Sequence, residues 1–564
     1  MKNNSLWIIL HRLRWPLIVI VTTYTIAIIG LLLIPGVDEQ GNQYYMSIFD
    51  AFYFVTYTAT TIGFGELPHT FTHAQRIWVS MSIYMLVVGW FYSIGVVVSL
   101  LQDKLFLNEL AKANFKRHIN NIDRPFVIIL GYSYMTNEII KKLQKRGLKA
   151  VVIERDQSRA DILMLEGFQI HVPVLVADAH QIASLEFAGI KKFNCKALVS
   201  LFEDDNLNLR VALTAKSLNK NIKLAIKSTS HHHTDNLKDI GVDIIENPFS
   251  IIANHMHMAL NAPNLLKIER WIYKIGFLND SLPKLPRGKY IICGYGRMGR
   301  HIFEIFEKDG IESSFIEINE SYKNSTSKNE FEHIMYADGD DKESLINAGI
   351  MESVAIIAGT NDDTINLSIL TTAKKLNKDI ITIARENEFE DNSIFVNAKI
   401  DHIFMPSRIL INKTANALIH PLSDMFINQL KHQDEAWGQS LVNRLITTID
   451  ENPKIFELTL NKQYAPEVYN YLKNLNKLLT LEIFHASLRN RTQNNNIVPL
   501  LIKKKDEFLL LPSWDTILNE NDKILFACDE NAKDDILYIA QNPFEFEYIL
   551  TGKEKKTIFN FKKG

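Results

Sequence analysis

The sequence predicts a multidomain protein that combines an α-helical membrane domain of two spans, two Rossmann-like α/β domains and a small α+β carboxyl-terminal lobe. Three observations predict this fold class. Two apolar runs without charge lie near the amino terminus, a strand–glycine–helix pattern occurs twice in the middle, and short strands with a different spacing follow residue 452. A chain of 564 residues has room for several such domains.

The composition limits the partners and the compartment. The 62 basic and 64 acidic residues give a formal net charge of -2, which does not indicate a nucleic-acid partner. The three cysteines, Cys195, Cys293 and Cys528, form no CxxC pair and lie outside the apolar runs. This pattern fits a reducing cytoplasm without a disulfide framework.

Residues 1–104 are predicted to form the membrane domain, with spans at 15–37 and 77–102. Neither span contains a charge, and each exceeds the roughly 20 residues that a helix needs to cross a bilayer. The first is too long for the core of a signal peptide. Basic residues precede the first span and follow the second, whereas Asp38 and Glu39 open the loop between the spans. The positive-inside rule therefore places both termini in the cytoplasm, in a multi-pass protein of the cell (inner) membrane.

The stretch 47–66 between the spans is too short to cross, and we expect a re-entrant pore helix followed by an ion-selectivity filter. In Thr61-Ile62-Gly63-Phe64-Gly65, glycines alternate with larger residues, which permits a strand whose successive carbonyls point the same way. Rings of such oxygens from four chains would replace the water around a bare cation held at Thr61, Ile62, Gly63 and Phe64. One loop per chain therefore predicts a homotetramer in the lipid bilayer.

This stretch resembles the potassium-channel signature T-V-G-Y-G-D, which stands here as Thr61-Ile62-Gly63-Phe64-Gly65-Glu66. Phe64 lacks the tyrosine hydroxyl that braces the filter in the family, and Glu66 has a longer arm than aspartate. The resemblance implies a K+-selective pore, while these departures keep a weakly selective cation channel as an alternative. A Thr/Gly-rich turn between two strands is the other interpretation of the pattern.

Gly89 lies within the second span. Members of the family bend the inner helix at a glycine, so the resemblance implies a gating hinge at Gly89. Close packing of helices at a small residue explains the same glycine equally well.

The soluble part contains a tandem repeat, with Rossmann-like domains expected at 125–265 and 288–430. In each copy an apolar strand runs into a glycine turn, a helix follows, and a second strand ends in glutamate. This alternation predicts a parallel, doubly wound sheet. Linkers are expected at 105–124 and 266–287, and the carboxyl-terminal lobe at 431–564.

The second copy carries a complete G-x-G-x-x-G fingerprint, and Glu317 follows about 20 residues later. The glycines permit a tight turn, the approach of a pyrophosphate and close helix packing, and the acid suits ribose hydroxyls but repels a 2′-phosphate. We therefore expect NAD, or ADP/ATP, rather than NADP; some such folds keep the glycines for packing alone. The predicted nucleotide-binding residues are Gly294, Tyr295, Gly296, Arg297, Met298, Gly299, Glu317, Asp338 and Arg385, although a solvated surface also explains Arg385.

The first copy has Gly131, Ser133 and Thr136 at the fingerprint positions. The side chains of Ser133 and Thr136 would crowd a phosphate, so this domain is predicted to be a structural or ion-sensing partner.

These features resemble the regulator-of-K+-conductance (RCK) family over nearly the whole chain. The resemblance implies that eight such units from four chains form a cytoplasmic ring, and that a ligand in its clefts pulls on the inner helices. Asp178 and Asp338 match an acid near which some members bind Ca2+. We therefore keep Ca2+ as a second candidate effector, with its site unassigned. No catalysis is expected.

Two local predictions concern motifs outside this scheme. In the carboxyl-terminal lobe, which resembles the small lobe of RCK domains, residues 479–486 are predicted to form a strand. The run His231-His232-His233 is predicted to be a solvated turn, because three neighbours on one segment rarely share a metal ion.

Two rival functions share parts of the pattern. A membrane-anchored NAD-dependent oxidoreductase needs a proton donor in a substrate domain, and the sequence offers no candidate. A membrane-anchored NAD-binding regulatory subunit of a K+ transporter shares the tandem domains but lacks a filter of its own.

Overall fold

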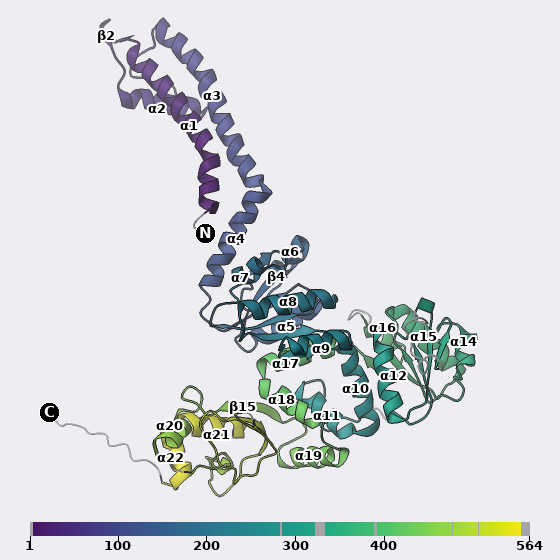
Figure 1. Cartoon of the computed structure of the whole chain (residues 1–564). Coiled ribbons are helices and arrows are strands. Elements are labelled where there is room, and N and C mark those ends of the chain that lie inside the picture. The colour runs from purple at the N-terminus through teal and green to yellow at the C-terminus, as the bar shows by residue number, and fades with distance from the viewer. Residues whose placement is uncertain are drawn as a thin grey trace, which may run out of the picture. The chain divides into compact units, whose positions relative to one another are not determined.

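A computed structural model describes residues 4–282, 285–321, 333–387, 392–475, 478–505 and 507–553. The chain divides into two compact units, Met1–Ile122 and Asp123–Gly564, and each is described by itself. Figure 1 shows the elements with their labels.

The first unit is helical apart from a short hairpin. Two of its helices are long and apolar enough to cross a membrane, Leu13–Leu33 within α1 and His73–Gln102. The short helix α2 packs against both, and their shared core includes Leu31, Phe54 and Leu86. The elements are α1 (Asn4–Leu33), β1 (Gly36–Val37), β2 (Gln43–Tyr44), α2 (Ile48–Ala59), α3 (His73–Gln102) and α4 (Lys104–Asn120).

The ends of these helices follow from local chemistry. The first helix stops at Leu33, short of the predicted end of the span at 37, because Pro35 cannot donate a helical hydrogen bond. The other long helix starts earlier than predicted, at His73, where Thr72 and Gln75 form a capping box. The stretch 105–124, predicted to be a linker, is mostly the helix α4.

The second unit contains two six-stranded parallel sheets with equivalent strand orders, β5-β4-β3-β6-β7-β8 and β11-β10-β9-β12-β13-β14. This confirms the doubly wound topology that the repeat predicts. The first domain contains β3 (Phe126–Leu130), α5 (Tyr134–Gln144), β4 (Lys149–Glu154), α6 (Gln157–Leu165), β5 (Val174–Val176), α7 (Ile182–Phe187), β6 (Cys195–Ser200), α8 (Asp205–Leu218), β7 (Lys223–Lys227), α9 (His231–Asp239) and β8 (Ile244–Glu246). The second contains β9 (Tyr290–Cys293), α12 (Arg297–Asp309), β10 (Ser313–Glu317), β11 (Ile334–Tyr336), α14 (Lys342–Asn347), β12 (Ala355–Ala358), α15 (Asp363–Leu376), β13 (Ile381–Arg385), α16 (Asn392–Asn397) and β14 (His402–Phe404).

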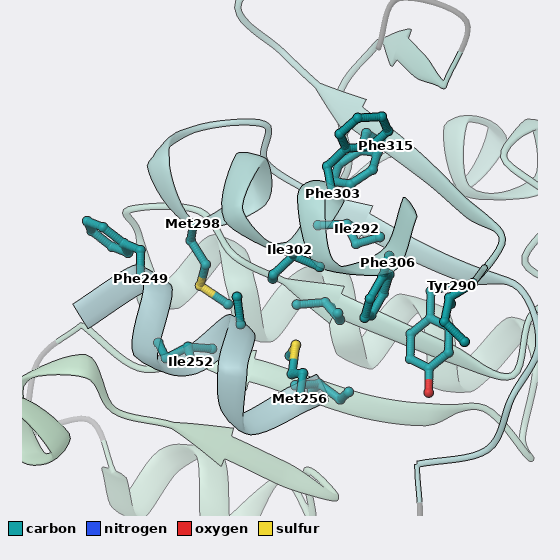
Figure 2. Packing of buried hydrophobic residues seen from close by; sticks show 14 of the residues in the cluster. Phe249, Ile252, Met256, Tyr290, Ile292, Met298, Ile302, Phe303, Phe306 and Phe315 are labelled. Atoms are coloured by element: carbon teal, nitrogen blue, oxygen red, sulfur yellow. The ribbon is translucent and has the colours of Figure 1, made fainter. Parts of the chain in front are cut away.

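The two α/β domains exchange helices. Helix α10, which follows the last strand of the first domain, packs on α12 and places Phe249, Ile252 and Met256 in the core of the second domain (Figure 2). Helix α17 follows the second domain and places Leu410 and Ile411 in the core of the first. We call α10 and α17 the crossover helices, and each is followed in the chain by a second helix. The four are α10 (Pro248–Asn261), α11 (Pro263–Ile272), α17 (Pro406–Ile419) and α18 (Pro421–Leu430).

The stretch 266–287 was predicted to be a linker, but helix α11 occupies its start. Its residues Ile268 and Trp271 are buried in a core shared with α18 and α19. The remainder of that stretch contains Pro283 and Lys284, which lie outside the described residues.

The carboxyl-terminal lobe is built on an antiparallel sheet with strand order β15-β18-β16-β17. The predicted strand at 479–486 is wrong: Leu481–Phe484 is a 3-10 helix. Its apolar residues Leu481, Ile483 and Phe484 are all buried, which a flat strand that alternates faces does not achieve. The elements are α19 (Glu435–Thr448), β15 (Lys454–Thr459), α20 (Pro466–Leu475), β16 (Ile497–Lys504), β17 (Glu507–Leu510), β18 (Lys523–Cys528), α21 (Glu530–Gln541) and α22 (Pro543–Thr551).

Candidate functional site

The segment after α2 has the alternating backbone that the sequence predicts. Thr61, Gly63 and Gly65 have positive φ angles of 62°, 63° and 74°, whereas the residues between them do not. The N–H groups of Ile62 and Gly63 both donate to the Tyr57 carbonyl, at 3.0 and 3.2 Å, which turns the chain back at the end of the helix. A left-handed β-branched residue such as Thr61 is costly, and such residues concentrate at functional sites.

Two tyrosines on α2 hold the outer end of this segment. The Tyr53 hydroxyl donates to the Glu66 carboxylate at 3.0 Å, and the Tyr57 hydroxyl donates to the Glu66 carbonyl at 3.0 Å. Phe64 stacks edge-on against Tyr57, with ring centroids 6.2 Å apart. Two hydroxyls from the preceding helix therefore hold Glu66, beside a Phe64 ring that has no hydroxyl of its own, and the motif alone does not reveal these contacts.

Gly89 lies inside the continuous helix α3 and faces α1. A Cβ atom there would lie 3.1 Å from the Thr23 methyl group, and Ser93 donates to the Gly89 carbonyl at 2.8 Å. This geometry favours close helix packing as the reason for the glycine. The hinge stays a prediction.

In the second α/β domain, a cleft of about 390 Å³ opens at the carboxyl ends of the strands. Parallel sheets bind ligands at this edge, where the strand order reverses between β9 and β12. The cleft brings together six of the nine predicted residues, which are Gly294, Gly296, Arg297, Glu317, Asp338 and Arg385. A larger cleft, about 1040 Å³, lies between α11 and the carboxyl-terminal lobe and contains none of them.

The three fingerprint glycines have different physical reasons. Gly294 has a φ of 103°, which only glycine adopts readily. A Cβ at Gly299 would collide with the Gly294 carbonyl oxygen, so this glycine permits close helix packing. A Cβ at Gly296 would meet nothing within 4 Å and would stand in open cleft space. The protein itself therefore does not require glycine at 296, whereas a ligand that approaches the backbone does.

Glu317 lines the cleft, but its carboxylate also supports the glycine turn. Its oxygens accept hydrogen bonds from the N–H groups of Tyr295, at 2.6 Å, and Asn319, at 2.8 Å. Glu154 makes the equivalent contact to Tyr132 in the first domain, which has no complete fingerprint. Both acids therefore brace the turn, and binding of a ribose would be an additional role at Glu317.

Two arginines bring positive charge to the cleft, which Glu317, Asp338 and Asp340 also line. Arg297 and Arg385 lie on the ring of Phe249, with guanidinium carbons 5.0 and 5.2 Å from its centroid. Burial, with a contribution from Arg297, lowers the pKa of Arg385 to about 10. The Arg385 Nε is buried without a hydrogen-bond partner in the described part of the chain, while its Nη1 donates to Asn361 at 3.0 Å.

Tyr295, Met298 and Gly299 are the predicted residues that do not line the cleft. The Tyr295 and Met298 side chains are buried in the core cluster of the domain (Figure 2 labels Met298), and only the backbone of Tyr295 reaches Glu317. Asn361 and Asp340 line the cleft without having been predicted. Both residues lie shortly after a strand of the sheet, and this position in the sequence could have identified them. Phe249 carries no such signal, because it comes from the other domain.

The first domain fills the equivalent place with its own side chains. Ser133 and Thr136 form a capping box at the start of α5, with the Ser133 N–H donating to the Thr136 hydroxyl at 2.8 Å. The start of α12, by contrast, has no side-chain cap. An uncapped helix start, a glycine with free space and two cations fit a diphosphate group, and these features belong to the second domain.

Comparison with known proteins defines the class. Residues 17–103 match the family model described as ion channel, and residues 127–248 and 290–406 each match the TrkA-N domain model. The chain is therefore an ion-channel protein with two TrkA-N (RCK) domains. It is homologous to archaeal and bacterial potassium channels.

Individual relatives agree with this assignment. Potassium channel protein 1 of Methanocaldococcus jannaschii is 25% identical over 290 residues, 49% of this chain and 82% of that protein. An uncharacterized protein of Methanothermus fervidus is 24% identical over 245 residues, 43% of this chain, and the match spans only 37% of that protein. The solved structure described as GsuK channel covers 98% of this chain and 100% of its own, with a TM-score of 0.51 and 17% identity, and so shares the fold.

Proposed function

We propose that the chain is the subunit of a homotetrameric, K+-selective channel in the cell (inner) membrane, with its termini and TrkA-N domains in the cytoplasm. The observation that carries this proposal is the alternation of left-handed residues at Thr61, Gly63 and Gly65, directly after the short helix α2. One chain supplies one such segment, and Ile62 and Phe64 are 60% and 64% exposed in the single chain. Four copies around an axis would cover these side chains and complete the oxygen rings.

The gating ligand that we propose is an adenine nucleotide, NAD or ADP/ATP, bound in the cleft of the second TrkA-N domain. Gly296, the uncapped start of α12 and the cations Arg297 and Arg385 suit its phosphates, and Glu317 excludes a 2′-phosphate. A ligand changes the open probability only by its difference in affinity between the open and closed states. The role is regulatory, and we assign no catalytic residue.

Flux measurements test both parts. The full-length protein is reconstituted into K+-loaded vesicles, and K+ efflux is recorded with NAD, ADP and NADP. We expect K+ efflux that changes with NAD or ADP and much less with NADP. The Gly296→Asp variant should keep the efflux and lose the nucleotide response. A monomer in the membrane, or vesicles that release no K+ with any nucleotide, would overturn the proposal.

A weakly selective cation channel is the second candidate, and Phe64 with Glu66 is the observation that favours it. The hydrogen bonds from Tyr53 and Tyr57 to Glu66 restore a brace at the outer end and support selectivity. Reversal potentials in mixed K+ and Na+ decide between the two.

Ca2+ remains a second candidate effector. Asp178 is engaged by Arg155 at 3.3 Å, whereas Asp338 and Asp340 border the nucleotide cleft. Recordings with and without Ca2+ at constant nucleotide concentration test this role.

A further inference from the structure

Three side chains of the metal-binding type meet at the contact between the two TrkA-N domains. His231 is the first residue of α9 in the first domain, so the run His231-His232-His233, predicted to be a solvated turn, is instead the start of a helix. His301 and Glu304 are neighbours on α12 in the second domain. The His231 Nε2 lies 3.1 Å from the Glu304 Oε2, and the His301 Nδ1 lies 3.7 Å from the same oxygen. The three candidate ligand atoms all lie within 4.8 Å of one another.

These distances are close to those of a tetrahedral metal centre. Zinc binds nitrogen and oxygen at about 2.0 to 2.2 Å, which places neighbouring ligands about 3.4 Å apart. The two distances to Glu304 lie on either side of this value. The two histidine nitrogens lie within 4.8 Å of each other, and the His231 side chain, which is 64% exposed, has room to adjust toward a metal ion. We propose that His231, His301 and Glu304 bind a transition-metal ion of the Zn2+ type, with water as the fourth ligand.

The ligand set selects the class of metal. Two imidazoles and one carboxylate suit Zn2+, Co2+ or Ni2+, whereas Ca2+ and Mg2+ prefer oxygen ligands alone. This site is therefore chemically distinct from the Ca2+ role considered above.

Asn247 adds a cost to metal binding. Its side-chain nitrogen lies 3.2 Å from the His301 Nε2, while its oxygen caps the start of α10 through the N–H groups of Phe249 and Ser250. In this arrangement the His301 Nε2 accepts and Nδ1 carries the proton. Binding of a metal at Nδ1 moves the ring proton to Nε2, and the contact with Asn247 must then rearrange. The site would consequently bind a metal ion more weakly than a site in which the histidine already has the required tautomer. Metal binding would also alter the contact with Asn247, which caps the start of α10.

A hydrogen-bonded cluster without a metal is the competing explanation. It accounts for the contact between His231 and Glu304, but leaves the His301 Nδ1 at 3.7 Å, beyond a good hydrogen bond. The neighbouring histidines provide an internal comparison. His232 points to Asn236, at 3.4 Å, and His233 lies 2.9 Å from the Ser230 hydroxyl, so neither takes part in the cluster.

Cobalt spectroscopy tests the site. The full-length protein, without a histidine tag, is stripped with a chelator and titrated with Co2+, and visible absorption reports tetrahedral coordination. We expect one Co2+ per chain, displaced by Zn2+. His231→Ala and Glu304→Gln, both at exposed positions, should weaken binding at least about tenfold. His232→Ala is the matched control and should leave it unchanged.

The outcomes separate the two explanations. A missing cobalt spectrum, or one that persists in His231→Ala, would overturn the metal site. Neither result depends on the nucleotide or on ion flux, so the test is independent of the proposed channel function.

Discussion

At the scale of the residue, the second TrkA-N domain shows how one motif combines unrelated demands. Gly294 provides a left-handed turn, Gly299 permits a close contact, and Gly296 leaves space that the protein does not fill. The fingerprint therefore predicts both a packing role and a binding role. The packing and turn demands lie at Gly299 and Gly294, which leaves Gly296 for the proposed binding role and makes the two roles separable by mutation.

Gly296→Ala and Gly299→Ala form a matched pair. The first places a methyl group in the open cleft, so we expect the free energy of unfolding to change by about 1 kcal/mol or less, and nucleotide affinity to fall at least about tenfold. The second drives a methyl group into the Gly294 carbonyl, and we expect a loss of about 1–3 kcal/mol of stability. Calorimetric titration with NAD and thermal unfolding in detergent measure the two effects. Equal loss of stability in both variants would contradict the assignment.

The hydrogen bond from Tyr53 to Glu66 gives a second prediction at this scale. Tyr53→Phe removes that bond and keeps the ring, so the outer end of the filter should be held by Tyr57 alone. We expect a correctly assembled channel with a lower K+ over Na+ permeability ratio or a faster loss of current. Tyr45→Phe, which alters only a contact with Gln43 in the hairpin, is the control. An unchanged permeability ratio and time course would remove Tyr53 from this role.

At the scale of the element, the start of helix α18 depends on a side chain from the next lobe. His420 precedes this helix and provides no side-chain cap. The Glu457 carboxylate on β15 accepts from the N–H groups of Leu422, at 2.9 Å, and Ser423, at 3.2 Å. Burial, only partly offset by these two bonds, raises the pKa of Glu457 to about 7. The carboxyl-terminal lobe is therefore joined to the crossover helices through a group that titrates near neutrality.

The raised pKa of Glu457 makes the stability of the folded protein depend on pH in a definite direction. Because the folded pKa lies above the unfolded one, the folded state binds more protons, and stability falls as pH rises from about 4.5 to about 7. Glu457→Gln keeps an acceptor for the helix and removes the charge, so its stability should depend less on pH across this window. Thermal midpoints at pH 5, 6.5 and 8 measure the effect, with the exposed Glu482→Gln as control. If both variants follow the wild-type pH profile, Glu457 does not titrate as described.

Most elements were predictable because their patterns are local. The two apolar runs and the strand–glycine–helix repeats appear in the structure as α1, α3 and the two sheets. The stretch 479–486 was misassigned because a short apolar run fits a strand and a 3-10 turn equally well. Contacts between distant segments, such as Glu457 with α18 or His231 with α12, leave no periodic trace in the sequence.

At the scale of the whole molecule, the exchange of α10 and α17 places a helix that follows each TrkA-N domain in the core of the other. The sequences of these helices do not indicate which domain covers their buried faces. Phe249 illustrates the consequence, because a residue from the first domain supports both arginines of the cleft in the second. A site read from the second domain alone is therefore incomplete.

Leu410→Ala tests the exchange. Leu410 follows the second domain in sequence but lies fully buried in the core of the first. We expect a loss of about 2–5 kcal/mol, with faster hydrogen exchange in β3 and β4 rather than in β9 and β10. Ile302→Ala, in the core around α12, should show the reverse distribution. Faster exchange confined to the second domain in Leu410→Ala would contradict the exchange of helices.

The late position of α17 in the sequence also delays completion of the first domain during synthesis. The last strand of the first TrkA-N domain ends at Glu246, yet α17, which completes its core, ends only at Ile419. At a translation rate of about 5–20 residues per second, the ribosome needs on the order of ten seconds or more to supply that missing wall. Throughout this interval the apolar surface that α17 later covers stays open in the nascent domain, where a chaperone can bind it.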